Sequence, residues 1–148
     1  MDLSGAYTFS ASPQIVWDLL NDPNVIASCL PGCERLEPIG DDRYRAVLKL
    51  AVASVSGEYV GTVAMLDKRA PLSYRLVVDG SGKPGFMKGE AAVELTPQDA
   101  GTVVMVKGTG QVGGLVARVG QRLLGSVSKM IMDRFFACLQ DRAKEIRN

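Results

Sequence analysis

The segment from about Gln111 to Arg147 most constrains what this chain can fold into. It contains no proline, and its apolar residues recur at the spacing of an α-helix. These residues are Val112, Leu115, Val116, Val119, Leu123, Val127 and Met130. At about 100° per residue, their side chains lie within one broad sector, which is the face that a helix buries against a core. We therefore expect one long C-terminal helix.

The first thirty residues predict one strand and two short helices. Apolar and polar residues alternate from Leu3 to Ser10, as in a strand with one buried face. Ser12 is a typical N-cap and Pro13 suits the first position of a helix that runs to Leu20. Pro23 ends that helix and begins a second one that reaches about Cys29.

The segment between these helices and the C-terminal helix is predicted to contain six strands. Turns rich in glycine, proline and aspartate separate them, and connections this short favour antiparallel neighbours. The predicted strands are Cys33–Ile39, Tyr44–Val55, Glu58–Lys68, Ser73–Asp79, Phe86–Thr96 and Thr102–Gly110. The fold class is therefore α+β: a seven-stranded curved antiparallel sheet, two short helices and a long C-terminal helix, with residues 1–148 forming one domain.

Alternation of side chains assigns the buried face of only some strands. From Tyr44 to Val52 and from Met87 to Leu95, apolar residues alternate with positions that carry most of the charges, so one face of the sheet is wet. The strands at 58–68 and 102–110 alternate poorly, and their inner faces are not assigned by this pattern.

Composition excludes several classes of protein. The 17 basic and 16 acidic residues nearly cancel, which argues against a nucleic-acid binder that needs a concentrated positive face. No stretch reaches the roughly 18 apolar residues of a membrane span. Residues 1–4 have neither a basic start nor an apolar run, so no secretory signal is expected. With three cysteines, the chain is expected to be a reduced, cytoplasmic protein.

The chain lacks the residues of the commonest catalytic and metal sites. It has no histidine, so neither a Ser-His-Asp nor a Cys-His arrangement can form. Cys29 and Cys33 are four residues apart, but a metal site would need two more ligands and only Cys138 remains as a thiol. We expect small packed thiols and no metal, with a redox pair of Cys29 and Cys33 as the alternative hypothesis.

Two glycine-rich features bear on a binding site. The loop Gly80–Gly85 lacks the Gly-Lys-Ser/Thr ending of a phosphate loop and leads into no helix, so it is read as a mobile hairpin that could gate a cavity. Gly120 and Gly125 lie inside the predicted helix, where glycine costs about 1 kcal/mol relative to alanine. Either close packing against the sheet or a helix that lifts to admit a ligand would explain them.

Four stretches of the sequence resemble the CoxG family, which is associated with carbon monoxide dehydrogenases. They are Ser12–Pro23, Cys29–Cys33 (Cys-Leu-Pro-Gly-Cys), Gly40–Tyr44 and Gly120–Leu124. The predicted order of elements also resembles the helix-grip fold of the START-like, Bet v 1-like (SRPBCC) superfamily. This resemblance implies a non-catalytic accessory protein of a molybdenum-containing carbon monoxide dehydrogenase-type enzyme. It also implies a quinone or lipid-like ligand, without a covalent cofactor, in a cavity between the sheet and the C-terminal helix.

The resemblance also bears on location. Many longer family members carry a C-terminal tail or anchor, whereas this chain stops at Asn148. We therefore expect at most peripheral contact with the inner face of the membrane.

The candidate ligand-binding residues are large and apolar and flank the proposed cavity. They are Leu30, Leu48, Leu50, Met65, Phe86, Met87, Met105, Leu115, Val119 and Leu123. Two other functions stay open. A cyclase or hydrolase on the same fold would use Arg75, Glu58 or Tyr59, and an interaction module with a filled core would bind no ligand. Fold alone cannot choose among them.

Overall fold

The computed structural model describes residues 1–51 and 55–146, and it contains one sheet and three α-helices in this part of the chain. The elements are β1 (Asp2–Phe9), α1 (Pro13–Leu20), α2 (Pro23–Cys29), β2 (Cys33–Gly40), β3 (Arg43–Leu50), β4 (Gly57–Arg69), β5 (Ser73–Gly82), β6 (Gly85–Gln98), β7 (Gly101–Gly113), the 3₁₀ helix η2 (Gly114–Val119) and α3 (Gln121–Ile146). Residues 52–54 of the predicted second strand and Arg147 of the predicted helix lie outside the described residues.

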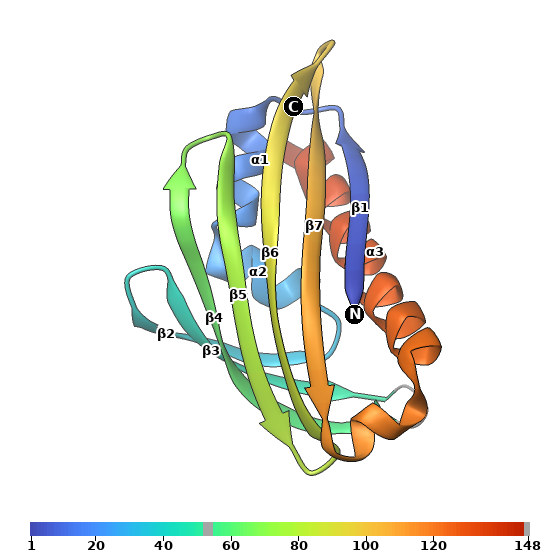
Figure 1. The fold of residues 1–148 in the computed structure, drawn as a ribbon. Helices are drawn as coiled ribbons and strands as arrows, with labels where there is room; N and C mark the ends of the chain where they lie inside the picture. The colour runs from blue at the N-terminus through green and yellow to red at the C-terminus, as the bar shows by residue number, and fades with distance from the viewer. Residues whose placement is uncertain (52–54, 147–148) are drawn as a thin grey trace.

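The seven strands form one antiparallel sheet in the order β1-β7-β6-β5-β4-β3-β2. Strands β2 to β7 follow one another as hairpins, and β1 returns to the far edge to pair with β7. The sheet curls, and α1, α2 and α3 lie on its inner side (Figure 1). The predicted helix-grip architecture is confirmed.

The register assigns the inner face of every strand, including the two that the sequence left open. Tyr74 and Val93 face each other across β5 and β6, and Val93 faces Val106 across β6 and β7. All three are buried, so alternate residues from these positions point inward. Tyr59 and Met65 of β4 share this inner face, whereas Glu58 and Thr62 point outward.

Both short helices begin where capping residues predict. The Ser12 hydroxyl accepts a hydrogen bond from the Ile15 amide at 3.4 Å, and Pro13 occupies the first turn of α1. The Asp22 carboxylate accepts a hydrogen bond from the Asn24 amide at 2.9 Å, with Pro23 at the start of α2. The two helices bury their apolar faces in the interior.

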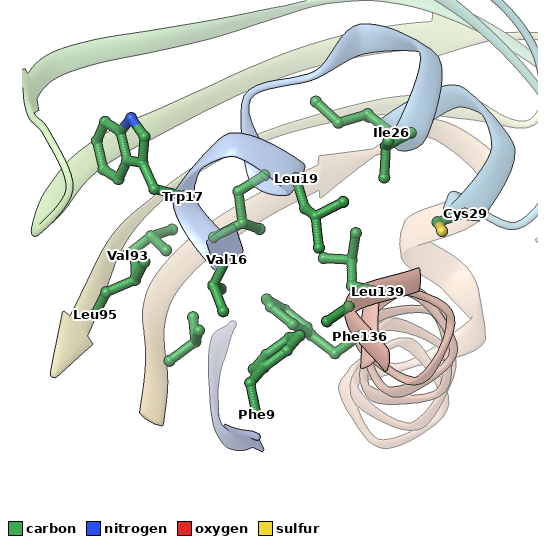
Figure 2. Packing of buried hydrophobic residues seen from close by; sticks show 14 of the residues in the cluster. Phe9, Val16, Trp17, Leu19, Ile26, Cys29, Val93, Leu95, Phe136 and Leu139 are labelled. Carbon is green, nitrogen blue, oxygen red and sulfur yellow. The ribbon is translucent and has the colours of Figure 1, made fainter. Parts of the chain in front are cut away.

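Two separate hydrophobic clusters fill the interior. The main cluster joins α1, α2 and the second half of α3 to one end of the sheet, and Figure 2 shows its packing. Phe136 and Leu139 of α3 meet Phe9 of β1 and Val16 of α1 in this cluster. The small cluster lies toward η2 and consists of buried Leu50, Val55, Tyr59, Val116, Leu124 and Val127.

The C-terminal helix begins later than its apolar spacing predicts. Strand β7 continues to Gly113, so Val112 belongs to the sheet, and a 3₁₀ helix occupies residues 114–119 before α3 starts at Gln121. The backbone of Gly120 has φ 91° and ψ 154°, a region that is almost restricted to glycine. Gly120 therefore separates η2 from α3, and the predicted single helix is wrong over residues 111–120.

The expected reduced state of the cysteines is also wrong for two of them. A disulfide joins Cys29 at the end of α2 to Cys138 of α3, with their Cα atoms 5.4 Å apart. This separation suits a disulfide, and it arises because α2 packs against α3. Cys33 is a free thiol that donates a hydrogen bond to the Arg35 carbonyl at 3.4 Å, so it is not the partner of Cys29. Burial raises the pKa of the Cys33 thiol.

We predict that this disulfide makes a large contribution to stability. A cross-link across 109 residues restricts the unfolded chain strongly, so Cys138→Ser should lower the free energy of unfolding by about 2–4 kcal/mol. Urea unfolding without reductant measures this difference, and Cys33→Ser is the matched control that should change it little. Intact mass after alkylation of the denatured, unreduced protein should show one modified thiol. Three modified thiols would contradict the pairing.

Candidate ligand-binding interior

The second half of α3 is fixed to the edge of the sheet. The rings of Tyr7 in β1 and Phe136 in α3 stack with their centroids 4.1 Å apart. The Tyr7 hydroxyl donates a hydrogen bond to Asp133 at 2.6 Å, and the Lys129 ammonium binds the same carboxylate at 2.7 Å. The hydrogen bonds from Lys129 and Tyr7 lower the pKa of Asp133. Together with the disulfide, these contacts hold this half of the helix in place.

The helix is supported at its sides and not by the centre of the sheet. Its principal neighbours are β1, α1, α2 and η2. The central strands β4, β5 and β6 are not among these neighbours, so contact with them depends on side chains. The space between α3 and the central strands is therefore set by the size of the side chains that line it.

The inner face at the centre of the sheet carries mostly small residues. We call these positions the central band; they are Ala46, Gly61, Val63, Val78, Gly80, Met87, Gly89 and Gly110, which face inward in the register. None of them belongs to either hydrophobic cluster. Val63, Val78 and Met87 point inward and yet stay partly exposed. Water-sized space therefore adjoins the central band.

Close approach of two strands requires one of the glycines in this band. A Cβ atom at Gly61 would lie 2.0 Å from the Asp79 carbonyl oxygen and 2.6 Å from the Gly80 Cα. Any side chain there would push β4 away from β5. The sequence thus keeps the inner face bare where the sheet bends.

Gly125 shows open space on the helix side. It lies seven residues before Met132, two helical turns away, and so shares the face of α3 that carries Met132 and Phe136. These two residues are buried, but a Cβ atom at Gly125 would meet no atom within 4 Å beyond its own helix backbone and chain neighbours. Close packing therefore does not explain this glycine, and the second sequence-based explanation, helix mobility, stays a prediction.

Seven of the ten candidate ligand-binding residues lie in or beside the interior. Leu50 is buried in the small cluster, and Leu48, Val119 and Leu123 pack against it. Met65 is buried in the main cluster, whereas Met87 belongs to the central band. Leu30 ends α2 and is partly buried.

The other three candidates lie on the outside. Met105 is 54% exposed, because in β7 it has the parity of Lys107 and not that of Val104. Phe86 is 43% exposed on the outer face of β6, and Leu115 is 59% exposed on η2. They cannot line a space beneath α3 in this arrangement.

Sequence reasoning missed four residues of the interior: Val63, Val78, Gly110 and Gly125. The alternation of Tyr74, Leu76 and Val78 already indicated the inward direction of Val78. The other three needed the register or the true start of α3.

The polar residues considered for catalysis do not meet in the interior. Arg75 lies on the outer face and binds Asp67 at 3.2 Å and Glu90 at 3.3 Å. Glu58 is exposed on the outer face of β4. The Tyr59 hydroxyl is inside but donates a hydrogen bond to the Val55 carbonyl at 2.7 Å, and burial raises the pKa of Tyr59. Burial also raises the pKa of Tyr74, so both phenols stay neutral at ordinary pH.

Two shallow depressions on the surface offer no alternative ligand site. One of about 470 Å³ lies at the β4–β5 turn between Asp67 and Arg75. The other, of about 450 Å³, lies over the outer face near Asp2, Glu90 and Lys107. Both are open and largely lined by charged residues, and none of the ten candidates lines them.

Comparison with known proteins identifies the family. The family model of CoxG, a subunit described by its association with carbon monoxide dehydrogenase, matches residues 5–144, nearly the whole chain. This chain belongs to the CoxG family. Membership of this family indicates an accessory protein on a START-like fold. None of the curated proteins compared with the chain matches it.

Solved structures show the same fold. A conserved protein from Geobacillus kaustophilus is 36% identical with a TM-score of 0.95, over 98% of this chain and 96% of its own. A START superfamily protein from Mycobacterium smegmatis is 12% identical with a TM-score of 0.77, over 98% of both chains. The Zhui aromatase/cyclase from a Streptomyces species, R1128, is 16% identical with a TM-score of 0.69, over 100% and 96% of the two chains.

Among the described residues, no helix combines the length and the apolar character that crossing a bilayer requires.

We predict opposite effects for alanine at the two glycines that flank the start of α3. Gly125→Ala should raise the free energy of unfolding by about 0.5–1 kcal/mol, because the helical backbone accepts alanine and the methyl group meets open space. Gly120→Ala should lower it by about 1–3 kcal/mol, because φ is 91° there. Thermal and urea unfolding measure both. A loss of stability in Gly125→Ala would mean that the space is not open.

Proposed function

We propose that this protein is a non-catalytic carrier that binds an apolar molecule, a quinone or a lipid, between the inner face of the sheet and α3. It would serve as an accessory of a molybdenum-containing carbon monoxide dehydrogenase-type enzyme. Family membership supports the accessory role. The ligand class rests on the chemistry of the interior.

The observation that carries this proposal is the central band beneath α3. Its small residues and partly exposed valines and methionine lie between two closed clusters, where a packed core would be expected to continue. Space lined by such residues favours an apolar guest, since buried polar groups of a ligand would find few partners there. Met87 can adapt its shape to the guest.

The positions of the polar candidates favour a carrier over an enzyme. A cyclase or hydrolase needs polar groups directed at the substrate. Arg75 and Glu58 point away from the interior, and the Tyr59 hydroxyl already has an acceptor. The likeness to an aromatase/cyclase shows the fold alone.

We predict that a bulky side chain in the central band blocks ligand binding. Val78→Phe should weaken binding of decylubiquinone about tenfold or more, because the ring would occupy the space that the ligand needs. Val77→Phe is the matched control, since Val77 is the neighbouring residue on the opposite face of β5 and is also partly exposed. Quenching of the fluorescence of Trp17, the single tryptophan, measures binding.

Several outcomes of this experiment would contradict the carrier proposal. Equal affinity in the two variants would place any binding outside the central band. No quenching of the natural protein by decylubiquinone, together with no apolar molecule in a solvent extract of the purified protein, would favour an interaction module without a ligand.

The accessory role predicts a physical association. The tagged chain, purified from its own cells, should retain a molybdenum-containing dehydrogenase that mass spectrometry and metal analysis identify. Retention that persists in Val78→Phe would separate enzyme docking from ligand binding. Failure to retain any molybdenum enzyme would contradict the accessory role and leave the ligand proposal standing.

A further inference from the structure

One end of the molecule brings together the β5–β6 turn, η2 and the start of α3. The Val116 amide donates a hydrogen bond to the Pro84 carbonyl at 2.7 Å. Phe86 pairs with Gly113 across β6 and β7, and its ring covers the position that a Gly113 side chain would take. These segments therefore lie side by side at the lower end of the view in Figure 1. We call residues 83–86 and 114–122 the η2 end.

Two large apolar side chains project from the η2 end. Leu115 is 59% exposed and Phe86 is 43% exposed. The other large exposed apolar residues of the described chain, Ile39, Leu72, Met105 and Ile146, come from four separate elements or turns. The η2 end thus combines an exposed aromatic and an exposed aliphatic residue on segments that touch.

The 3₁₀ geometry of η2 divides its residues into a buried and an exposed set. Side chains three positions apart lie on the same side of such a helix. Val116 is buried in the small cluster and Val119 packs against it. Leu115 and Arg118 share another side, and both are exposed. An apolar and a cationic side chain therefore point outward together.

The η2 end is also strongly basic. Lys83, Arg118 and Arg122 are exposed, and none of them forms an ion pair with a described residue. No aspartate or glutamate occurs between Asp99 and Asp133. On the neighbouring strand, Glu58 lies opposite Lys49 in the register, so this acid does not offset the three cations.

We propose that the η2 end docks on an anionic phospholipid surface. Phe86 and Leu115 would enter the boundary between headgroups and acyl chains, and Lys83, Arg118 and Arg122 would bind lipid phosphates. A few protruding apolar side chains among unpaired cations suit a deformable, negatively charged surface. A specific protein partner would instead need about 800 Å² with an apolar centre depleted in charge.

This surface goes beyond the proposed function, since it requires no ligand in the interior. Docking at this end would place η2, Gly120 and the first half of α3 against the membrane. If the carrier proposal also holds, an apolar molecule could pass between bilayer and protein without crossing water. The two proposals are tested separately, because vesicle binding is measured without added quinone.

The experiment is co-sedimentation of the full chain with vesicles. The protein should bind vesicles of phosphatidylcholine and phosphatidylglycerol, mixed in a ratio of roughly 7:3, at least tenfold more tightly than vesicles of phosphatidylcholine alone. Binding should weaken as salt increases, because salt screens exposed charges. Equal affinity for both vesicles, or binding to neither, would overturn the proposal.

Variants locate the contact. Leu115→Ser should weaken binding about tenfold by removing inserted apolar area, and Arg118→Ala should weaken it about fivefold, since one cation near the surface contributes about that factor. The controls are Leu72→Ser, at an exposed leucine of the β4–β5 turn, and Arg134→Ala, at an exposed arginine of α3. If a control lost as much affinity as its matched variant, the η2 end would not be the docking site.

Discussion

The attachment of the second half of α3 determines the rest of this structure. Phe136 and Leu139 are buried in the main cluster, Tyr7 stacks on Phe136, and the Cys29–Cys138 disulfide joins α3 to α2. These contacts place one half of the helix firmly over β1, α1 and α2. The first half then extends past the central strands with fewer close neighbours, and the small cluster supports its other end. A covered and incompletely filled interior is the direct result.

Most of the fold could be predicted because it depends on local patterns. Proline and glycine mark the turns, and alternation marks the inward face of strands such as β6, where Lys88, Glu90 and Glu94 point outward. The disulfide could not be predicted, because Cys29 and Cys138 are 109 residues apart and meet only through tertiary packing. The break at Gly120 was hidden for another reason: Val116 and Val119 have the same spacing in a 3₁₀ helix as on the face of an α-helix.

The candidate site was predicted less completely than the fold. Residues on clearly alternating strands, such as Leu48 and Met87, were placed on the inner face. Met105 was misplaced because both faces of β7 carry apolar residues, so its parity was ambiguous until the pairing with β6 was known. Leu115 and Phe86 belong to apolar patterns and yet face solvent. Their exposure makes sense only as a surface feature, which a search for buried residues does not consider.

The positive φ of Gly120 has a consequence for the adaptability of the protein. Helix α3 is joined to η2 through this single residue at one end and is cross-linked to α2 at the other. Between these two attachments, residues 121–131 can tilt without breaking a strand pairing, whereas enlarging the interior by bending the sheet would break ladder hydrogen bonds. Guests of different lengths are therefore accommodated at least cost by the angle of one short helical segment, while the sheet keeps its curvature.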